Sequence, residues 1–259
     1  MKFRIWGSIS MAAAAAALLW MAPAPASGQA KAYAPPKAWD NHADLSGIWE
    51  AHNRAYVSLE PRTPSLHMPA SPGYIVDPPD GKIPYRPEAL AKRNQNAKER
   101  EKLDGVNSCY MPGIPRLMYM GFPFQIFQTP KYVIVASEYA HVYRTIYTDG
   151  SKHIDGLEFW DGDSRGHWEG DTLVVEVTNF NTDTWFDMAG NHHSDALKVT
   201  ERFQRTADDT LMYEATIEDP KTFTRPWRIR MPMKRDTQAN ARLFEYECHS
   251  YLEDAAAGK

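Results

Sequence analysis

Short segments with alternating hydrophobic residues follow one another from Phe122 onward, and tight turns separate several of them. This period of two predicts strands at 132–136, 141–147, 164–168, 172–178, 197–205, 210–218, 223–231 and 242–249. Turn sequences stand at Asp149-Gly150, Glu169-Gly170-Asp171 and Ala207-Asp208-Asp209. Because no helical pattern separates these strands, we expect an antiparallel meander, and closure into a barrel would remove its exposed edges. The chain is therefore predicted to be mostly β, with the meander closing into a β-barrel.

The segment before these strands has a different character. Residues 31–86 are rich in proline, which fixes φ and removes a backbone donor, so we predict a long extended arm with a short strand entry at 44–50. Disorder is the alternative for this arm. Residues 87–105 are predicted to form one peripheral helix, since Pro87 suits a first helical position and Gly105 suits its end. The barrel would comprise residues 106–259 and form a single domain with the arm.

The first thirty residues have the pattern of a secretory signal peptide. Lys2 and Arg4 precede an apolar stretch from Ile9 to Trp20, and small residues with prolines follow it. An uncleaved N-terminal anchor is the alternative. No later segment is apolar over enough residues to span a bilayer, so membrane insertion is not expected. We therefore expect an exported protein, either periplasmic or extracellular.

Charge and cysteine content limit the partners of the exported part. Two of the 29 basic residues and none of the 33 acidic residues lie in the first thirty positions, so the remainder has a net charge of −6. A nucleic-acid partner is not expected, because no basic stripe is present to neutralise phosphates. Cys109 and Cys248 are expected to form a disulfide in an oxidising compartment, linking the segment before the barrel strands to the last strand. Two separate buried thiols are the alternative.

The segment from Glu138 to Tyr147 contains the first candidate site. In a strand, alternate residues share a face, so His141, Tyr143, Thr145 and Tyr147 would point one way and Arg144 the other. If the first face lines the barrel interior, an imidazole and two phenols would be available there for acid–base chemistry or ligand binding. The alternative is the solvent face of a half-buried strand.

A second candidate site is the connection from Thr184 to Asp195, which contains Trp185, Asp187 and the adjacent pair His192 and His193. Adjacent histidines in a strand point apart, and no metal-binding spacing is present, so no metal site is assigned. A polar loop is the alternative. A third candidate is Glu201, which alternates with apolar residues and would need a partner such as Arg144 if buried. A buried carboxylate with a raised pKa could act as a general acid or base, and an ion pair that only holds the fold is the alternative.

The stretch from Gly73 to Trp227 resembles a family of exported bacterial proteins for which we know no settled activity. The residues that carry the resemblance are Val76–Tyr85, Pro112–Arg116, Glu138–Gly150, Gly166–Val175, His193-Ser194 and Thr216–Pro220. Separately, Ser46-Gly47-Ile48-Trp49 resembles the G-x-W motif in the first strand of lipocalin-type barrels. That second resemblance implies a lipocalin-like β-barrel.

These features favour an extracytoplasmic enzyme, a lyase or hydrolase, that acts on a small glycoside, aromatic or terpenoid-like molecule without a cofactor. The sequence lacks G-x-S-x-G, G-x-G-x-x-G and P-loop motifs, which makes a nucleotide cofactor unexpected. The predicted catalytic residues are His141, Tyr143, Tyr147 and His193, and the predicted substrate-binding residues are Arg144, Glu201, Trp185 and Asp187. The alternatives are a non-catalytic binding protein for a small hydrophobic or aromatic ligand, and a structural protein of the cell envelope.

Overall fold

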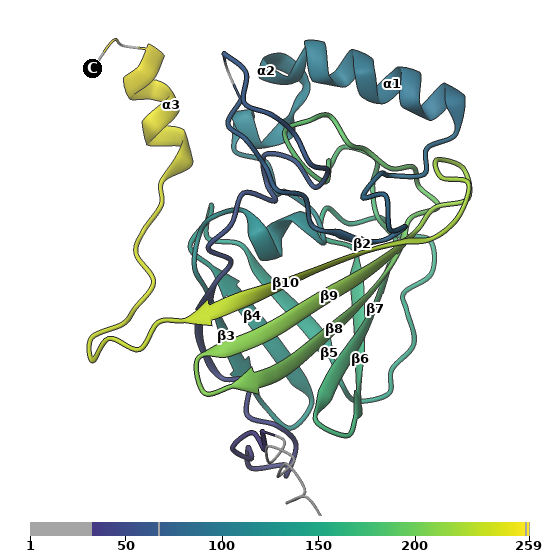
Figure 1. Cartoon of the computed structure of the whole chain (residues 1–259). Coiled ribbons are helices and arrows are strands. Elements are labelled where there is room, and N and C mark those ends of the chain that lie inside the picture. Colours follow the sequence, from purple (N-terminus) through teal and green to yellow (C-terminus); the bar gives the residue numbers. More distant parts are fainter. Residues whose placement is uncertain (1–32, 67, 257, 259) are drawn as a thin grey trace, which may run out of the picture. The chain divides into compact units, whose positions relative to one another are not determined.

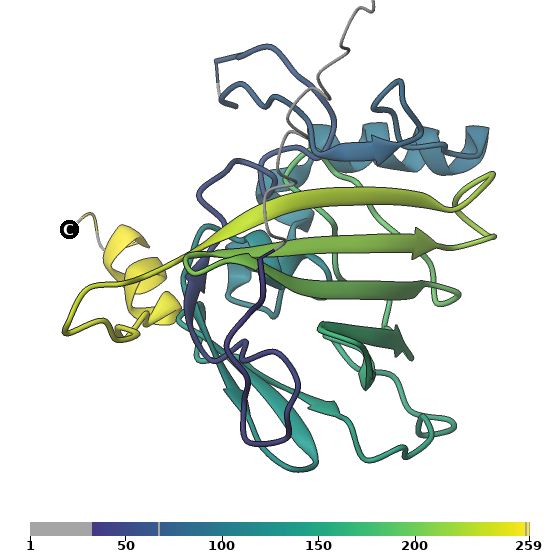
Figure 2. The same cartoon turned by 60° about the horizontal axis from the view of Figure 1, so that its bottom comes forward.

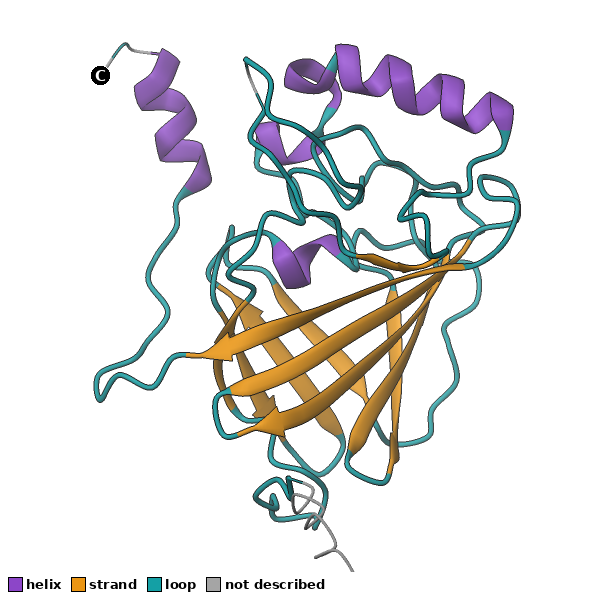
Figure 3. Cartoon of the chain, in the orientation of Figure 1, coloured by secondary structure: helices purple, strands orange, loops and turns teal. Residues whose placement is uncertain are grey.

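The computed structural model describes residues 33–66, 68–256 and 258, so the predicted signal peptide lies outside the described residues. Figure 3 distinguishes the strands of the barrel from the short helices. The strands are β1 (Gly47–Glu50), β2 (Ile75–Asp77), β3 (Phe124–Gln128), β4 (Tyr132–Ser137), β5 (Tyr143–Tyr147), β6 (Asp163–Glu169), β7 (Thr172–Thr178), β8 (Lys198–Ala207), β9 (Thr210–Glu218) and β10 (Trp227–Arg235). The helices are α1 (Pro87–Lys98), α2 (Arg100–Leu103), α3 (Cys248–Ala256) and the 3-10 helices η1 (Gly105–Ser108) and η2 (Arg116–Tyr119).

The strands form one sheet in the order β1-β3-β4-β5-β6-β7-β8-β9-β10, and pairing of β1 with β10 closes it into a nine-stranded barrel (Figure 1). The remaining strand, β2, pairs with β10 outside this ring. The predicted mostly β, lipocalin-like barrel is therefore confirmed. The hairpins β6–β7 and β8–β9 also follow the predicted turns.

One strand pair departs from the predicted antiparallel meander. β5 and β6 run parallel and share only the pairs Ile146↔Ser164 and Tyr147↔Arg165. Residues 148–162 connect them, and this length suffices for the chain to return to the starting end of the sheet. Figure 2 shows this connection as a long loop at the lower right, beside the barrel. The Asp149-Gly150 turn therefore begins a crossover and not a hairpin.

The ends of the predicted elements also differ. Residues 242–249 were expected to form a last strand, and this prediction is wrong, because the segment is irregular until α3 begins at Cys248. β1 already pairs with β10 and closes the barrel, so no free edge is left there for a further strand. The predicted helix over 87–105 is present as α1 and α2, which are interrupted at Glu99 with φ −109°. In Figure 1, α1 and α2 lie above the upper end of the barrel.

The inner faces of the strands are filled by side chains. β4, β5, β8, β9 and β10 alternate buried and more exposed residues over most of their lengths, as expected when one face meets a core. Large buried residues on these inner faces include Trp49, Phe124, Val135, Ile146, Val175, Phe203, Tyr213, Ile229 and Met231. The barrel interior is thus a packed core. Within the described residues, no helix is long and apolar enough to cross a membrane.

The predicted disulfide is present. Cys109 and Cys248 are bonded, with their Cα atoms 5.6 Å apart. The bond joins the end of η1 to the start of α3, and not to a strand as expected. It therefore holds the segment after β10, which runs outside the barrel (Figure 1), against the residues that follow α2.

Removal of this disulfide is expected to destabilise the protein by only about 1–2 kcal/mol. Chain entropy alone would give roughly 5 kcal/mol for a loop of this length. However, residues 236–247 form no helix or strand, so the tail would gain freedom in the folded state as well, which offsets most of that loss. Urea unfolding of the Cys109→Ser/Cys248→Ser variant measures the change. A loss near 5 kcal/mol would show that the tail is an integral part of the folded domain.

Candidate functional site

The predicted catalytic face of β5 lies outside the barrel. Tyr143 is 75% exposed and Tyr147 is 36% exposed, whereas Arg144 and Ile146 between them are buried. His141 precedes the strand with φ 53°, and its exposed ring places Nε2 2.5 Å from Glu247 Oε1. The expectation that these groups line an inner wall is therefore not met. The reason is the register, which pairs Arg144 with the buried Val135 and so directs the neighbouring phenols outward.

Arg144 and Glu201 form the predicted ion pair in the barrel core. Both side chains are buried, and the guanidinium meets the carboxylate at two points, one of them Nη1 to Oε1 at 3.1 Å. Arg144 Nε donates to Ser164 Oγ at 2.9 Å, and the Tyr213 hydroxyl donates to Glu201 Oε1 at 2.8 Å. Burial lowers the pKa of Arg144, but the charge and hydrogen bonding of Glu201, together with smaller contributions from Tyr213 and Asp161, outweigh this effect and leave the pKa raised. This arrangement favours the alternative of an ion pair that holds the fold.

Asp187 is also internal. Its carboxylate accepts hydrogen bonds from the Leu59 amide at 2.8 Å, the Ala189 amide at 3.0 Å and the Asn191 side chain at 2.7 Å. Burial raises its pKa to about 6, although these hydrogen bonds act in the opposite direction. The side chain is fully buried, so it joins the arm to this loop and is not exposed to a ligand.

The ring of His193 is enclosed on both sides. Nε2 lies 2.8 Å from Thr184 Oγ1, and Nδ1 lies 2.9 Å from the Ser194 carbonyl oxygen. Gly113 allows the close approach of Thr184, because a Cβ atom at this φ of +76° would lie 2.5 Å from the Thr184 hydroxyl. Burial lowers the pKa of His193. Both ring nitrogens lie within hydrogen-bond distance of groups inside the protein, so the role of His193 is to hold this loop in place.

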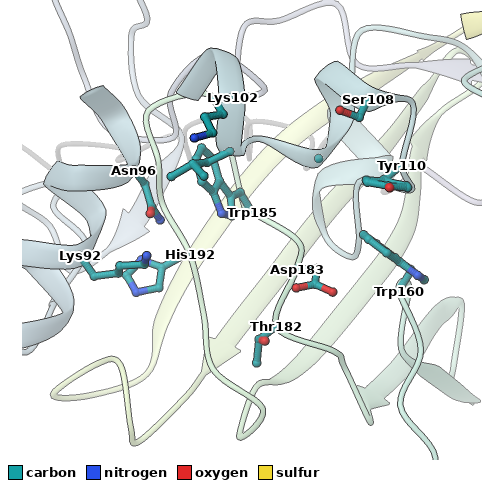
Figure 4. A pocket seen from close by; sticks show the side chains of 12 residues that line it. Lys92, Asn96, Lys102, Ser108, Tyr110, Trp160, Thr182, Asp183, Trp185 and His192 are labelled. Carbon is teal, nitrogen blue, oxygen red and sulfur yellow. The ribbon is translucent and has the colours of Figure 1, made fainter. Parts of the chain in front are cut away.

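An open groove of about 460 Å³ lies where α1, α2 and η1 face the loops around Trp160 and Trp185 (Figure 4). Of the eight predicted site residues, Trp185 is the one that lines it. The rings of Tyr110 and Trp160 stack with centroids 5.1 Å apart and contribute a second aromatic surface. The volume lies in the range of small-molecule sites. The full lining is Lys92, Asn96, Lys102, Leu103, Gly105, Ser108, Tyr110, Trp160, Thr182, Asp183, Trp185 and His192.

His192 is the histidine of the adjacent pair that lines this groove. Burial lowers its pKa to about 4, with smaller contributions from the charges of His193 and Lys92. The imidazole is therefore neutral at pH 7, and its buried Nδ1 has no hydrogen-bond partner among the residues that the structure describes. The sequence contained a signal for this residue. Neighbouring side chains in an extended segment point apart, so when one histidine of the pair is buried the other can face a groove.

The groove has charged groups of both signs, but their arrangement is not typical of a metal site. In the described part of the chain, no group of three or more His, Cys, Asp or Glu side chains could hold a metal ion. The groove offers two ammonium groups, a neutral imidazole, a carboxylate and aromatic rings, which together suit an organic ligand with a ring and polar substituents. Comparisons with protein-family models, curated proteins and solved structures find no match to this chain.

Proposed function

We propose that this protein works outside the cytoplasm as a binding protein for a small molecule that contains an aromatic or sugar ring, which it binds in the groove. The observation that carries the proposal is the presence of Tyr110, Trp160 and Trp185 along one groove of about 460 Å³. Aromatic faces bind planar rings and the apolar faces of sugars, and few other side chains at a surface provide such contacts. The signal-like N-terminal sequence and the disulfide support the extracytoplasmic location.

The separation of the titrating residues favours binding over catalysis. Acid–base partners must lie within hydrogen-bond reach of one substrate. Tyr143 and Tyr147 lie on the outer face of β5, while Arg144 and Glu201 are sealed in the core. Catalysis by a lyase or hydrolase remains the second candidate, and it would depend on His192, whose neutral imidazole could accept a proton in the groove.

Substitution of Trp160 by alanine is expected to weaken ligand binding by about 2- to 10-fold, because loss of an aromatic contact removes roughly 0.5–1.5 kcal/mol. The probe is p-nitrophenyl β-glucoside, which contains both an aromatic and a sugar ring, and the measurement is isothermal titration calorimetry. Trp39→Ala, which changes a tryptophan that is 60% exposed and does not line the groove, is the matched control and is expected to bind as the unaltered protein does.

Two results would argue against a binding protein. Failure of the unaltered protein to bind the probe at millimolar concentration would remove the support for the groove as a ring-binding site. Steady release of p-nitrophenolate during the titration would instead favour the hydrolase, and its loss in a His192→Gln variant would identify the imidazole that the reaction requires.

A further inference from the structure

We infer that the ligand of the groove is a hydroxylated ring compound that carries a carboxylate, as uronic acids do, and that Lys92 and Lys102 bind this carboxylate. The inference rests on the proposed function and names the class of molecule that the groove would take. It depends on the charges and hydrogen-bonding groups that line the groove, described below.

Among the described residues, two lysines with unpaired ammonium groups line the same groove. Lys92 and Lys102 line the groove, and neither forms a hydrogen bond or ion pair through its ammonium group with any residue that the structure describes. Some surface lysines elsewhere are paired, for example Lys221 with Asp195 at 2.7 Å and Lys234 with Asp209 at 3.2 Å, so the groove differs in bringing two unpaired lysines to one concave site. The chain as a whole has a net charge of −4, so this local excess of positive charge runs against the overall balance. Unpaired ammonium groups at a concave site attract an anion.

The charges along the groove have an uneven distribution. Asp183 is the only carboxylate in the lining, and the neutral His192 adds no positive charge at pH 7. In Figure 4, Lys92 lies beside His192, Lys102 lies above Trp185, and the stacked Tyr110 and Trp160 occupy the opposite side of the groove. A ligand could therefore place its carboxylate near the lysines while a ring rests against Trp160.

The remaining polar groups suit hydroxyl substituents. Asp183 and Thr182 lie together on the wall near Trp160 (Figure 4). A carboxylate accepts hydrogen bonds from hydroxyls, and a threonine hydroxyl can donate or accept them. An apolar carboxylic acid such as a fatty acid would leave these groups without partners, and that would weaken its binding. A hydroxylated ring acid satisfies both the cationic and the hydrogen-bonding parts of the groove.

The test compares two probes that differ mainly at one carbon, p-nitrophenyl β-glucuronide and p-nitrophenyl β-glucoside, by titration calorimetry at low ionic strength. We expect the glucuronide to bind about 10-fold more tightly, since each exposed ion pair contributes up to about 1 kcal/mol. Lys92→Gln and Lys102→Gln should each weaken glucuronide binding by about 2- to 5-fold and reduce the preference for the glucuronide over the glucoside by a similar factor. Lys98→Gln is the matched control, because Lys98 is also an exposed lysine of α1 but does not line the groove.

The outcomes separate this inference from the proposed function. Equal affinity for the two probes, with both weakened by Trp160→Ala, would overturn the carboxylate inference and leave the binding function standing. A glucuronide preference that survives both lysine substitutions would also overturn the assignment of the lysines. Absence of binding for both probes would overturn the binding function and the inference with it. Tighter glucuronide binding that Lys92→Gln and Lys102→Gln each weaken, and that weakens as salt is added, supports both.

Discussion

Substitution of Arg144 by methionine is expected to lower the free energy of unfolding by about 3–5 kcal/mol, because it leaves the Glu201 carboxylate buried without its counter-charge. Glu201 is fully buried and would keep, among the described residues, only the Tyr213 hydroxyl as a side-chain hydrogen-bond partner. An interior without a counter-charge favours the neutral form of the isolated carboxyl. Part of the lost free energy is therefore the cost of protonating this carboxyl at neutral pH. Urea unfolding monitored by tryptophan fluorescence measures the effect.

The control for this prediction is an ion pair at the surface. Arg228 lies 3.3 Å from Glu214, and both side chains are partly exposed, so Arg228→Met should change stability by less than about 1 kcal/mol. The double variant Arg144→Met/Glu201→Leu should recover most of the stability lost in Arg144→Met, because a buried ion pair can be replaced by apolar residues of similar volume. A loss below about 1 kcal/mol in Arg144→Met would contradict the view that this pair holds the barrel core together.

Substitution of Asp161 by asparagine is expected to stabilise the protein at pH 8, by up to about 3 kcal/mol. Asp161 is only 7% exposed, and neither carboxylate oxygen has a hydrogen-bond partner within the described residues. Burial raises its pKa from 3.8 to about 6, and the Arg144 charge and the Gly113 backbone amide lower the pKa by less. An ionised Asp161 is therefore costly in the folded state, and asparagine removes this cost.

The pH dependence follows from the direction of this shift. Because the folded-state pKa of Asp161 lies above its ordinary value of 3.8, the folded protein holds the proton more tightly than the unfolded chain does. The stability that this proton contributes is complete below about pH 4 and is lost as the pH rises through 6. The advantage of Asp161→Asn over the unaltered protein should therefore shrink as the pH falls from 8 to 4, when unfolding is measured across this range. Asp155→Asn, an exposed change in the same connection, is the control, and an equal effect from both would argue against burial as the cause.

Asp161 is also next to the groove-lining Trp160. The Asp161→Asn variant therefore tests whether a substitution that raises stability also changes ligand binding in the groove. Unsatisfied buried groups often occur beside functional sites, where the surrounding structure compensates for them. Asp161→Asn with undiminished probe binding would show that this carboxylate affects folding alone.

Local sequence patterns were sufficient where neighbours along the chain also form the structure. The hairpins β6–β7 and β8–β9 are close to their predicted ranges, because the turn and the two alternating strands are contiguous. The face of β5 was not settled by the same pattern. Alternation correctly placed Tyr143 and Tyr147 opposite Arg144, but either face of such a strand could have been the inner one. Pairing with β4 and burial of Arg144 against Glu201 decided that the phenols lie outside.

The candidate groove could be predicted only in part, because it too depends on contacts between segments that are distant in the sequence. Trp185 was expected to contact a ligand, and it does line the groove, whereas Lys92, Tyr110 and Trp160 come from segments far apart in the sequence. No local pattern states that these segments meet. His192 and His193 were a recognisable pair, yet their division into a groove-lining ring and a buried ring depends on how the loop packs.

The sequence by itself determined the periodic strands, the turns between them, the presence of a helix after Pro87 and a pair of cysteines able to form a disulfide. These properties depend on backbone preferences and on the spacing of apolar residues within a few positions. The tertiary structure alone decided the parallel β5–β6 pair, the helical end at α3, the outward face of β5 and the position of the groove. Each of these depends on which distant segment covers a given surface, and that choice depends on the packing of the whole domain.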